Sequence, residues 1–549
     1  MKRCAIGLDY GTLSVRAVLT DIFTGDIAAE SVFVYPHGIM DRLPGGEQLP
    51  PGWALQHPQD YLDGLKHVVR GVMKESGISP EAVGSVGLCA TSATILPVTE
   101  DLTPLCLTPA FENEPHAWMK LWKHHAAEPE AELIGQTARE RGEGWLDAYG
   151  GQVSAEWAVP KILETLRHAP RVYDRAYRFL DVMDFLTCKL TGKLTASGCA
   201  MGYKAFYRNG QFPDPMFYRS VDPRLEDLTR GKMGMPVSPV GACAGTLTAA
   251  MAAELGLEEG TPVGTPLIDG HASLPGCGVT RPGTLVIVMG TSACHLILSE
   301  KDAAIPGIQG TVKDGIMPGY YGIEAGQTCV GDLFGWAAEN CLTEAYVSQA
   351  RERGIDAHRL LTEKLAGYRP GKSGLIALDW FNGVRTPLMD YDLSGLILGI
   401  TLSTKPEDIY LALMEANAFG TRGIVELFER AGVGVDRIVL AGGIPEKNPL
   451  VPQICADVLG RPVERAKVRR ASAMGAAAAG IAAAPKEVTG CAGMADAVER
   501  LARKGEIFLP RPEHVRVYDG LYADYTALQD TFGRGGNDVM KRLSRLRRE

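Results

Sequence analysis

The chain has 549 residues, and its 56 Lys and Arg against 65 Asp and Glu leave a formal net charge of −9. A mildly acidic chain lacks the basic surface of a nucleic-acid-binding protein, so we expect no nucleic-acid partner. Hydrophobic residues make up 46% and charged residues 22%, which is typical of a globular enzyme and excludes a disordered chain. At about 150 residues per domain, this length predicts two to four domains.

The sequence offers no clear membrane or export segment. Residues 471–484 are the most apolar stretch, but they number only 14, whereas a spanning helix needs about 20. Residues 1–9 include Asp9 and lack the apolar core of a signal peptide. The 12 cysteines are scattered without a C-x-x-C pair. These features predict a cytoplasmic protein with free thiols and no membrane partner.

Two hairpins of the same kind are predicted about half the chain apart. Residues 3–9 form a short apolar strand and residues 15–19 a return strand, joined by a turn rich in Gly, Thr and Ser. Residues 284–289 and 294–298 repeat this arrangement around a similar turn. The repetition predicts two domains of similar construction.

Strands and helices alternate along the rest of the chain, which predicts the α/β fold class. Apolar residues at helical spacing predict helices over residues 60–74 and 408–429, and short apolar runs predict strands over 83–88 and 437–440. The small residues of 471–484 predict a helix that packs closely on a sheet or on a nucleotide.

The hairpin repeat divides the chain into an expected N-terminal domain, residues 1–280, and an expected C-terminal domain, residues 281–549. Residues 279–283 are the expected hinge between them. Residues 121–125 are expected in a partly buried helix with a polar face, whose adjacent histidines would not face one metal ion. The polar tail from about residue 513 predicts a solvated helix.

The glycine turns of the two hairpins are candidate phosphate sites. After Asp9, the turn Gly11-Thr12-Leu13-Ser14 offers amides and hydroxyls that can converge on phosphate oxygens, and the acid could hold Mg²⁺. The turn Gly290-Thr291-Ser292 repeats this chemistry. A single Gly-Thr turn is common without a ligand, so it is the pairing that favours a nucleotide held from both sides. In Ala441-Gly442-Gly443, the missing side chains would admit an adenosine ring, although an ordinary strand-to-helix turn would look the same.

Competing nucleotide motifs are absent from the sequence. Residues 367–373 resemble a P-loop but have three residues between the glycines where four are needed, so we interpret them as a surface turn. No G-x-G-x-x-G follows a strand, and there is no G-x-S-x-G or H-E-x-x-H motif. A dinucleotide enzyme, a serine hydrolase and a zinc protease are therefore unsupported.

Asp269 is the strongest candidate for a catalytic acid. It follows the apolar residues 263–268 and precedes the second hairpin, which places a carboxylate at the domain junction. The alternative is an Asp-Gly turn in which Asp269 caps a helix. Lys204 and Glu324 lie near glycines, as expected where the backbone approaches a small ligand, but a satisfied loop charge would look alike.

Several longer stretches are more specific. They are Tyr35-Pro36-His37-Gly38-Ile39-Met40-Asp41, Leu43-Pro44-Gly45-Gly46, Trp53-Ala54-Leu55-Gln56-His57-Pro58, residues 120–127, Glu324-Ala325-Gly326-Gln327 and residues 393–399. Together with the three glycine turns, they resemble the FGGY carbohydrate kinases over nearly the whole chain. Within that family they resemble the branch that phosphorylates L-ribulose.

The resemblance implies two RNase H-like domains of the actin/sugar-kinase superfamily around a cleft. It also implies ATP and Mg²⁺ as cofactors, and phosphorylation of a ketose, L-ribulose, at its 5-hydroxyl in L-arabinose catabolism. Asp269 matches the catalytic base and, with Asp9, is an expected Mg²⁺ ligand. The expected substrate-binding residues are Ser92, Trp122, Lys204, Asp269 and Glu324. The expected nucleotide-binding residues are Asp9, Gly11, Thr12, Ser14, Gly290, Thr291, Gly331, Gly442, Gly443 and Asn448.

One loop departs from the family pattern. Where the family carries Asp-Phe-Thr-Ala-Cys-Thr, this chain has Cys89-Ala90-Thr91-Ser92-Ala93-Thr94, which predicts relaxed or shifted sugar choice. One alternative is a related kinase for xylulose, D-ribulose or a polyol such as glycerol. The farther alternative is a non-catalytic actin-like ATP-binding switch, which would not need Asp269. A homodimer is expected only from the general frequency of two-fold assemblies.

Overall fold

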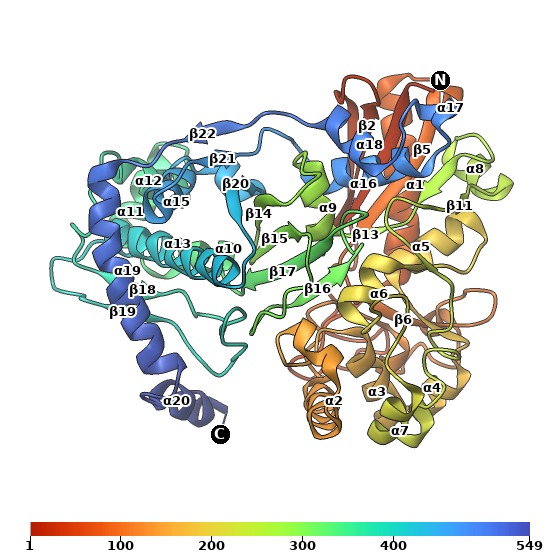
Figure 1. Ribbon diagram of the computed structural model, residues 1–549, viewed down its shortest axis with the longest axis horizontal. Helices are drawn as coiled ribbons and strands as arrows, with labels where there is room; N and C mark the ends of the chain where they lie inside the picture. Colours follow the sequence, from red (N-terminus) through yellow and green to blue (C-terminus); the bar gives the residue numbers. More distant parts are fainter. Residues whose placement is uncertain (1, 549) are drawn as a thin grey trace.

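The computed structural model describes residues 2–548 and shows two lobes that meet at a central junction (Figure 1). The first lobe holds a seven-stranded sheet in the order β11-β12-β5-β1-β2-β3, with β13 also paired to β5. Its strands are β1 (Cys4–Tyr10), β2 (Ser14–Asp21), β3 (Ile27–Val34), β5 (Val83–Ala90), β11 (Cys243–Thr246), β12 (Pro262–Gly264) and β13 (Leu267–Ile268).

The second lobe holds a seven-stranded sheet in the order β16-β17-β15-β14-β20-β21-β22. Its strands are β14 (Gly283–Met289), β15 (Ala293–Ser299), β16 (Gly310–Lys313), β17 (Tyr321–Gln327), β20 (Val435–Ala441), β21 (Val463–Arg465) and β22 (Glu506–Phe508). In both sheets the first strand pairs antiparallel with the second and parallel with a later one: β1 with β2 and β5, and β14 with β15 and β20. The two predicted hairpins and the predicted α/β fold class are confirmed.

Helices cover both faces of the first sheet. On one face, Tyr61 of α1 (Pro58–Ser76) stacks on Tyr10 with 5.6 Å between ring centroids. Side chains alternate along a strand, so Gly7 faces the other way, toward α16 (Ala471–Ala483). In chain order, α13 (Pro406–Arg430) of the second lobe comes between β17 and β20, as α1 comes between β3 and β5 in the first lobe. The predicted helices over 60–74, 408–429 and 471–484 are confirmed.

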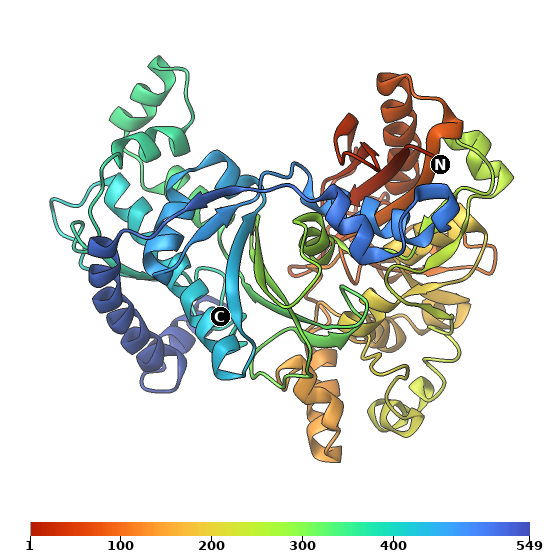
Figure 2. The same cartoon turned by 45° about the horizontal axis from the view of Figure 1, so that its top comes forward.

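The small residues of α16 allow it to lie directly on the first sheet. A Cβ atom added to Gly7, Gly87 or Gly264 would come within 2.0, 1.8 and 2.7 Å of helix carbonyl oxygens that follow one another at intervals of three residues, those of Ala473, Ala476 and Ala479. Although α16 follows the second sheet in sequence, it and α18 (Met494–Leu501) belong to the core of the first lobe. Figure 2 shows the chain crossing to the first lobe and returning through β22.

The lower part of the first lobe in Figure 1 contains a four-stranded sheet and several helices. Its strands are β4 (Leu55–Gln56), β6 (Ile95–Val98), β7 (Met119–Lys120) and β8 (Arg178–Asp181). Residues 121–125 form turns, so the prediction of a helix there is wrong. The cause is Glu164 of α3 (Ala158–His168), a buried carboxylate that Lys120 approaches to 2.6 Å and His124 to 3.0 Å.

The C-terminal tail consists of α19 (Pro512–Gly533) and α20 (Val539–Arg548). The predicted helix is confirmed, but α19 is solvated on one side only, because Tyr518 and Tyr525 are buried. The Tyr518 hydroxyl donates a hydrogen bond to Glu415 of α13 at 2.9 Å. Across residues 2–548, no helix combines the length and apolar character needed to cross a membrane. The predicted free thiols are present, since all 12 cysteines are unpaired.

Candidate active site

Two carboxylates meet where the strands of the first sheet end. Strand β1 pairs with one edge of β5, placing Asp9 opposite Cys89, and β13 pairs with the other edge, placing Leu267 opposite the same residue. Asp269 follows two residues later as the first residue of α9 (Asp269–Gly276). All three strands are parallel, so Asp9 and Asp269 lie at one carboxyl edge, where α/β sheets commonly bind ligands.

The surroundings of Asp269 keep its proton affinity high. Burial raises the pKa of Asp269 to about 7, and the charge of Asp9 adds to the rise. Burial also raises the pKa of Asp9, against the opposing effect of Arg16 at 3.6 Å. A carboxylate pair of this kind offers the oxygen ligands that Mg²⁺ prefers. A bound dication would also offset the repulsion between the two acids, so these residues fit the expected metal.

Asp269 does not act as a helix cap. The N-cap position of α9 is Ile268, which makes no side-chain capping bond. The Asp269 carboxylate accepts a hydrogen bond from the adjacent Gly270 amide at 2.7 Å. Its carboxyl group therefore remains at the junction between the lobes, beside the groups expected to hold a sugar.

A buried ion pair joins the two lobes next to Asp269. Lys204, at the end of α6 (Gly198–Lys204), donates to Glu324 in the middle of β17 at 2.9 Å. Burial would raise the pKa of Glu324, but the Lys204 charge holds it well below its usual range. His271 lies 3.3 Å from the same carboxylate. Positions predicted to bind the sugar from the two halves of the chain thus meet in space.

The first phosphate turn contacts the expected sugar wall. The Trp122 indole N–H donates to the Thr12 hydroxyl at 3.1 Å, and Gln56 donates to the Thr12 carbonyl at 2.6 Å. The Gly11 amide donates to the Ser14 carbonyl at 3.0 Å, and the Ser14 side chain is buried. The turn is therefore held rigidly, with Trp122 against it.

The second phosphate turn is built in the same way. The Gly290 amide donates to the Ser292 carbonyl at 2.9 Å, and the Val330 amide donates to the Thr291 carbonyl at 2.9 Å. The amides of Gly11 and Gly290 are therefore both used inside their hairpins and are not free to donate to a phosphate. The hydroxyls of Thr12 and Thr291 are among the donors that these turns offer.

Three glycine segments of the second lobe form one surface. The Gly331 amide donates to the Gly290 carbonyl at 3.0 Å. Gly442 has a φ of 100°, and a Cβ there would lie 2.4 Å from the Met289 carbonyl oxygen, so a larger residue is excluded. Gly443 begins α14 (Gly443–Lys447) directly afterwards. This bare backbone beside the second phosphate turn is where a nucleotide base or ribose would fit.

Asn448 follows α14, and its side chain has partners within the second lobe. Its side-chain oxygen accepts a hydrogen bond from the Leu450 amide at 3.0 Å, at the start of α15 (Leu450–Leu459). Its side-chain nitrogen lies 3.8 Å from the Met414 sulfur. Asn448 therefore supports the turn after Gly443 from inside the protein.

Asp269 lies between the two phosphate turns. On one side it neighbours Asp9, which precedes the first turn. On the other side, a Cβ added to Gly270 would come 3.6 Å from the sulfur of Cys294, two residues after the second turn. The carboxylate, both turns and the Lys204–Glu324 pair therefore belong to one site at the lobe junction.

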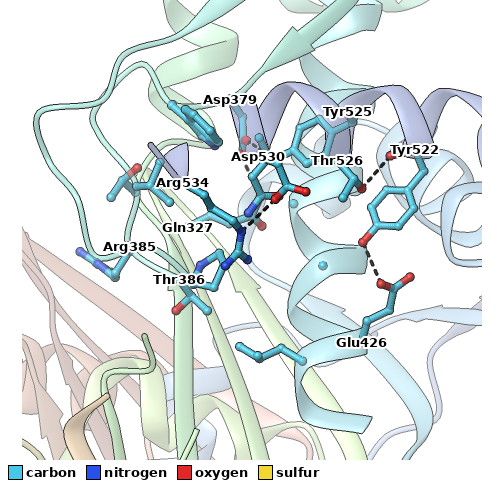
Figure 3. Close-up of a pocket in the computed structure, with 18 of the residues that line it drawn as sticks. Gln327, Asp379, Arg385, Thr386, Glu426, Tyr522, Tyr525, Thr526, Asp530 and Arg534 are labelled. Carbon is cyan, nitrogen blue, oxygen red and sulfur yellow. Dashed lines mark hydrogen bonds and ion pairs between the residues drawn. The ribbon is translucent and has the colours of Figure 1, made fainter. Parts of the chain in front are cut away.

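A separate cavity of about 390 Å³ lies in the second lobe, between α13, α19 and residues 379–387 (Figure 3). None of the predicted site residues lines it. Its polar groups bond to one another: Tyr525 donates to Asp379 at 3.1 Å, and Tyr522 donates to Glu426 at 3.0 Å. This cavity is therefore distinct from the site around Asp269.

Some residues that build the site were not predicted from the sequence. Lys161 and Asp181 are buried beside residues 91–94, the loop that carries Ser92. Arg385 approaches Glu156 to 3.6 Å. The sequence held one signal for Lys161: it interrupts the apolar run from Ala158 to Leu163, where a charge has no place unless it has buried partners.

Two lobes of matching topology, with a carboxylate between paired phosphate turns, define an enzyme of phosphoryl transfer. The chain belongs to the FGGY family of carbohydrate kinases, whose N-terminal domain matches residues 4–276 and whose C-terminal domain matches residues 285–484. A ribulokinase from Geobacillus thermodenitrificans is 47% identical over 547 residues, covering 99% of this chain and 97% of the relative. A ribulokinase from Mycolicibacterium smegmatis is 40% identical over 549 residues, covering 99% and 96%.

Solved structures share the fold at lower identity. The xylulose kinase from Rhodospirillum rubrum superposes with a TM-score of 0.77 at 24% identity, covering 96% of this chain and 99% of that one. The gluconate kinase from Lactobacillus acidophilus gives a TM-score of 0.78 at 17% identity, covering 97% and 99%. The two-lobed kinase fold is therefore confirmed.

Proposed function

We propose that the protein transfers the γ-phosphoryl group of ATP to the 5-hydroxyl of L-ribulose, a step of L-arabinose catabolism. Two ribulokinases are 47% and 40% identical to this chain, and the similarity extends over nearly the whole length of both. The observation that carries the proposal is the position of Asp269, between two phosphate turns and beside the Lys204–Glu324 pair.

In the proposed reaction, Asp269 accepts the proton of the sugar hydroxyl as that oxygen attacks phosphorus. Phosphoryl transfer depends mainly on positioning and charge neutralisation, so the orientation of the carboxylate matters more than its basicity. Lys204 and Glu324 hold the polar groups of the ketose, and Trp122 walls it. The hydroxyls of Thr12 and Thr291 donate to the charge that develops on the transferred group.

Asp9 and Asp269 would hold Mg²⁺. When bound, the ion supplies positive charge to the phosphate oxygens. The bare backbone at Gly331, Gly442 and Gly443 receives the nucleoside. Contacts between the lobes exclude water from the site. This exclusion protects the bound ATP from hydrolysis.

Substitution of the proposed base tests the mechanism. Asp269→Asn should lower kcat by about 10²–10⁴-fold, because it removes the proton acceptor, and should leave the Kd for the ketose nearly unchanged. The exposed Asp63→Asn on α1 is the matched control and should retain full activity. If Asp269→Asn kept kcat close to the unmodified enzyme, Asp269 would not be the base.

A substrate panel tests the identity of the sugar. We expect the highest kcat/KM for L-ribulose among L-ribulose, D-ribulose, L- and D-xylulose and glycerol. A higher value for another member would make the protein a different sugar kinase. ADP release at a rate independent of every sugar would instead indicate an ATP-binding switch.

A further inference from the structure

The loop between β5 and β6, which carries Ser92, is held in an unusual conformation. Ala93 has a φ of 47°, in the left-handed region that disfavours residues with a Cβ. Strain of this kind persists only where the surroundings enforce it, and it is common at ligand sites. The Thr91 amide donates to the Tyr10 carbonyl at 3.0 Å, and the Val182 amide donates to the Thr94 carbonyl at 2.9 Å. Both ends of the loop are thus fixed.

Two buried charged side chains hold the strained residue itself. The Asp181 carboxylate accepts a hydrogen bond from the Ala93 amide at 2.7 Å. The Lys161 ammonium donates to the Ala93 carbonyl at 2.8 Å. Asp181 is 2% exposed and Lys161 is 0% exposed. Both polar groups of Ala93 are therefore bound by ionisable side chains that water does not reach.

Lys161 also holds the other wall of the sugar site. Its ammonium donates to the carbonyls of Leu121 at 2.7 Å and Trp122 at 3.2 Å. Within residues 2–548 it has no carboxylate within ion-pair distance, so its bonds go to backbone carbonyls. Burial accordingly lowers the pKa of Lys161 to about 7. A buried ammonium is costly unless it is well bonded, and this one is used to join the Ser92 loop to Trp122.

We propose that Lys161 and Asp181 are positioning residues for the ketose: they lock the Ala93 peptide and tie it to Trp122, which sets the distance between the two sugar walls. The proposal rests on the function proposed above, in which Ser92 and Trp122 line the sugar. Neither residue need touch the sugar, because each acts through a backbone group. The clamp consists of four hydrogen bonds that join four chain segments: the loop at Ala93, residues 121–122, the first turn of α3 at Lys161, and Asp181 at the start of α5 (Val182–Thr191).

The test compares two variants with a matched control. Lys161→Met and Asp181→Asn should each raise the ketose Kd and KM about tenfold or more, as expected for loss of one or two buried hydrogen bonds, with KM for ATP within about twofold. They should also reduce the preference for L-ribulose over D-xylulose. The control, Thr187→Val, lies on α5, is equally buried, carries no charge, and its hydroxyl bonds the Met183 carbonyl rather than the loop. It should alter thermal stability but leave ketose KM and sugar preference unchanged.

Two outcomes would overturn the proposal: unchanged ketose affinity in both variants, or equal changes in KM for ketose and ATP. If Lys161→Met does not fold, Asp181→Asn decides, because it keeps the shape of the side chain. Trp122→Ala separates this proposal from the proposed function. If Trp122→Ala leaves ketose KM unchanged, the assigned sugar site is wrong. If it raises ketose KM while the clamp variants do not, only the clamp is wrong.

Discussion

The protonation state of Asp269 links its environment to the pH dependence of the reaction. The base must be ionised to accept a proton, and burial together with the Asp9 charge raises its pKa to about 7. Activity should therefore be lost as the pH falls through about 7. We expect log kcat/KM for the ketose to rise with unit slope at acidic pH and to level off above about 7, since this quantity reports the free enzyme. A profile that stays flat down to about pH 5, as an ordinary aspartate would give, would contradict the environment described.

Lys204 should affect sugar binding more than nucleotide binding. Its ammonium is the partner of Glu324 and also lowers the pKa of Asp269. Lys204→Ala should therefore raise KM for the ketose about tenfold or more, change KM for ATP much less, and shift the acid limb of the pH profile upward. Steady-state kinetics with each substrate varied in turn measure both effects. Equal changes in the two KM values would show that Lys204 is only structural.

At the scale of elements, the contact between α16 and α9 connects packing to catalysis. A Cβ on Gly475 would lie 1.7 Å from the Ala272 carbonyl oxygen, and one on Gly276 would lie 1.9 Å from that of Ala471. The two helices therefore touch backbone to backbone. Because α9 begins with Asp269, a displacement of this contact moves the proposed base.

Gly475→Ala should accordingly destabilise the protein and reduce kcat. Overpacking in a closed contact costs about 1–3 kcal/mol, and the Ala272 carbonyl oxygen belongs to the backbone, which cannot rotate away. Gly520→Ala in α19 is the control, because open space surrounds that position. There the change should stabilise the protein by about 0.5–1 kcal/mol, since alanine favours a helix. Thermal unfolding and kcat measure the difference, and equal effects at the two sites would contradict the close contact.

The same elements show what the sequence can and cannot predict. The hairpins around Gly11 and Gly290 and the helix over 471–484 were predictable, because each follows from a local pattern. The partner of that helix was not: Gly7, Gly87 and Gly264 form its seat only after β1, β5 and β12 align. Residues 121–125 failed as a predicted helix for a similar reason.

The conformation of those residues depends on Glu164, which lies 40 positions along the chain from His124 and 44 from Lys120. Asp269 was predictable in the candidate site because it ends an apolar strand. The clamp residue Asp181 was not, since its role depends on the left-handed conformation of Ala93, 88 positions away. Local patterns thus predict the elements, and the contacts between distant segments decide the details of the site.

At the scale of the whole molecule, several connections hold the lobes against each other, among them the Arg208–Asp302 ion pair at 2.7 Å. The chain itself crosses between them, because α16 and α18 pack on the first sheet while β22 returns to the second. The Lys204–Glu324 pair crosses beside the proposed base. Further out, Arg385 of the second lobe lies 3.6 Å from Glu156 of the first. Burial would raise the pKa of Glu156, but Arg385 and His125 hold it at about 2, so this acid stays ionised.

The Arg385–Glu156 contact should help to keep water out of the closed site. Arg385→Gln leaves the partly buried Glu156 carboxylate with His125 as its remaining ion-pair partner, which disfavours contact between the lobes. We expect a lower kcat and a higher ratio of ADP released without ketose to ADP released with it, because a more open junction admits water to ATP. The control is Arg430→Gln, an exposed arginine of the same lobe whose acidic neighbour, Glu426, is on its own helix. A coupled ADP assay measures the ratio, and small-angle scattering measures the change in overall dimensions. If the ratio were the same in both variants, the Arg385–Glu156 contact would not contribute to closure.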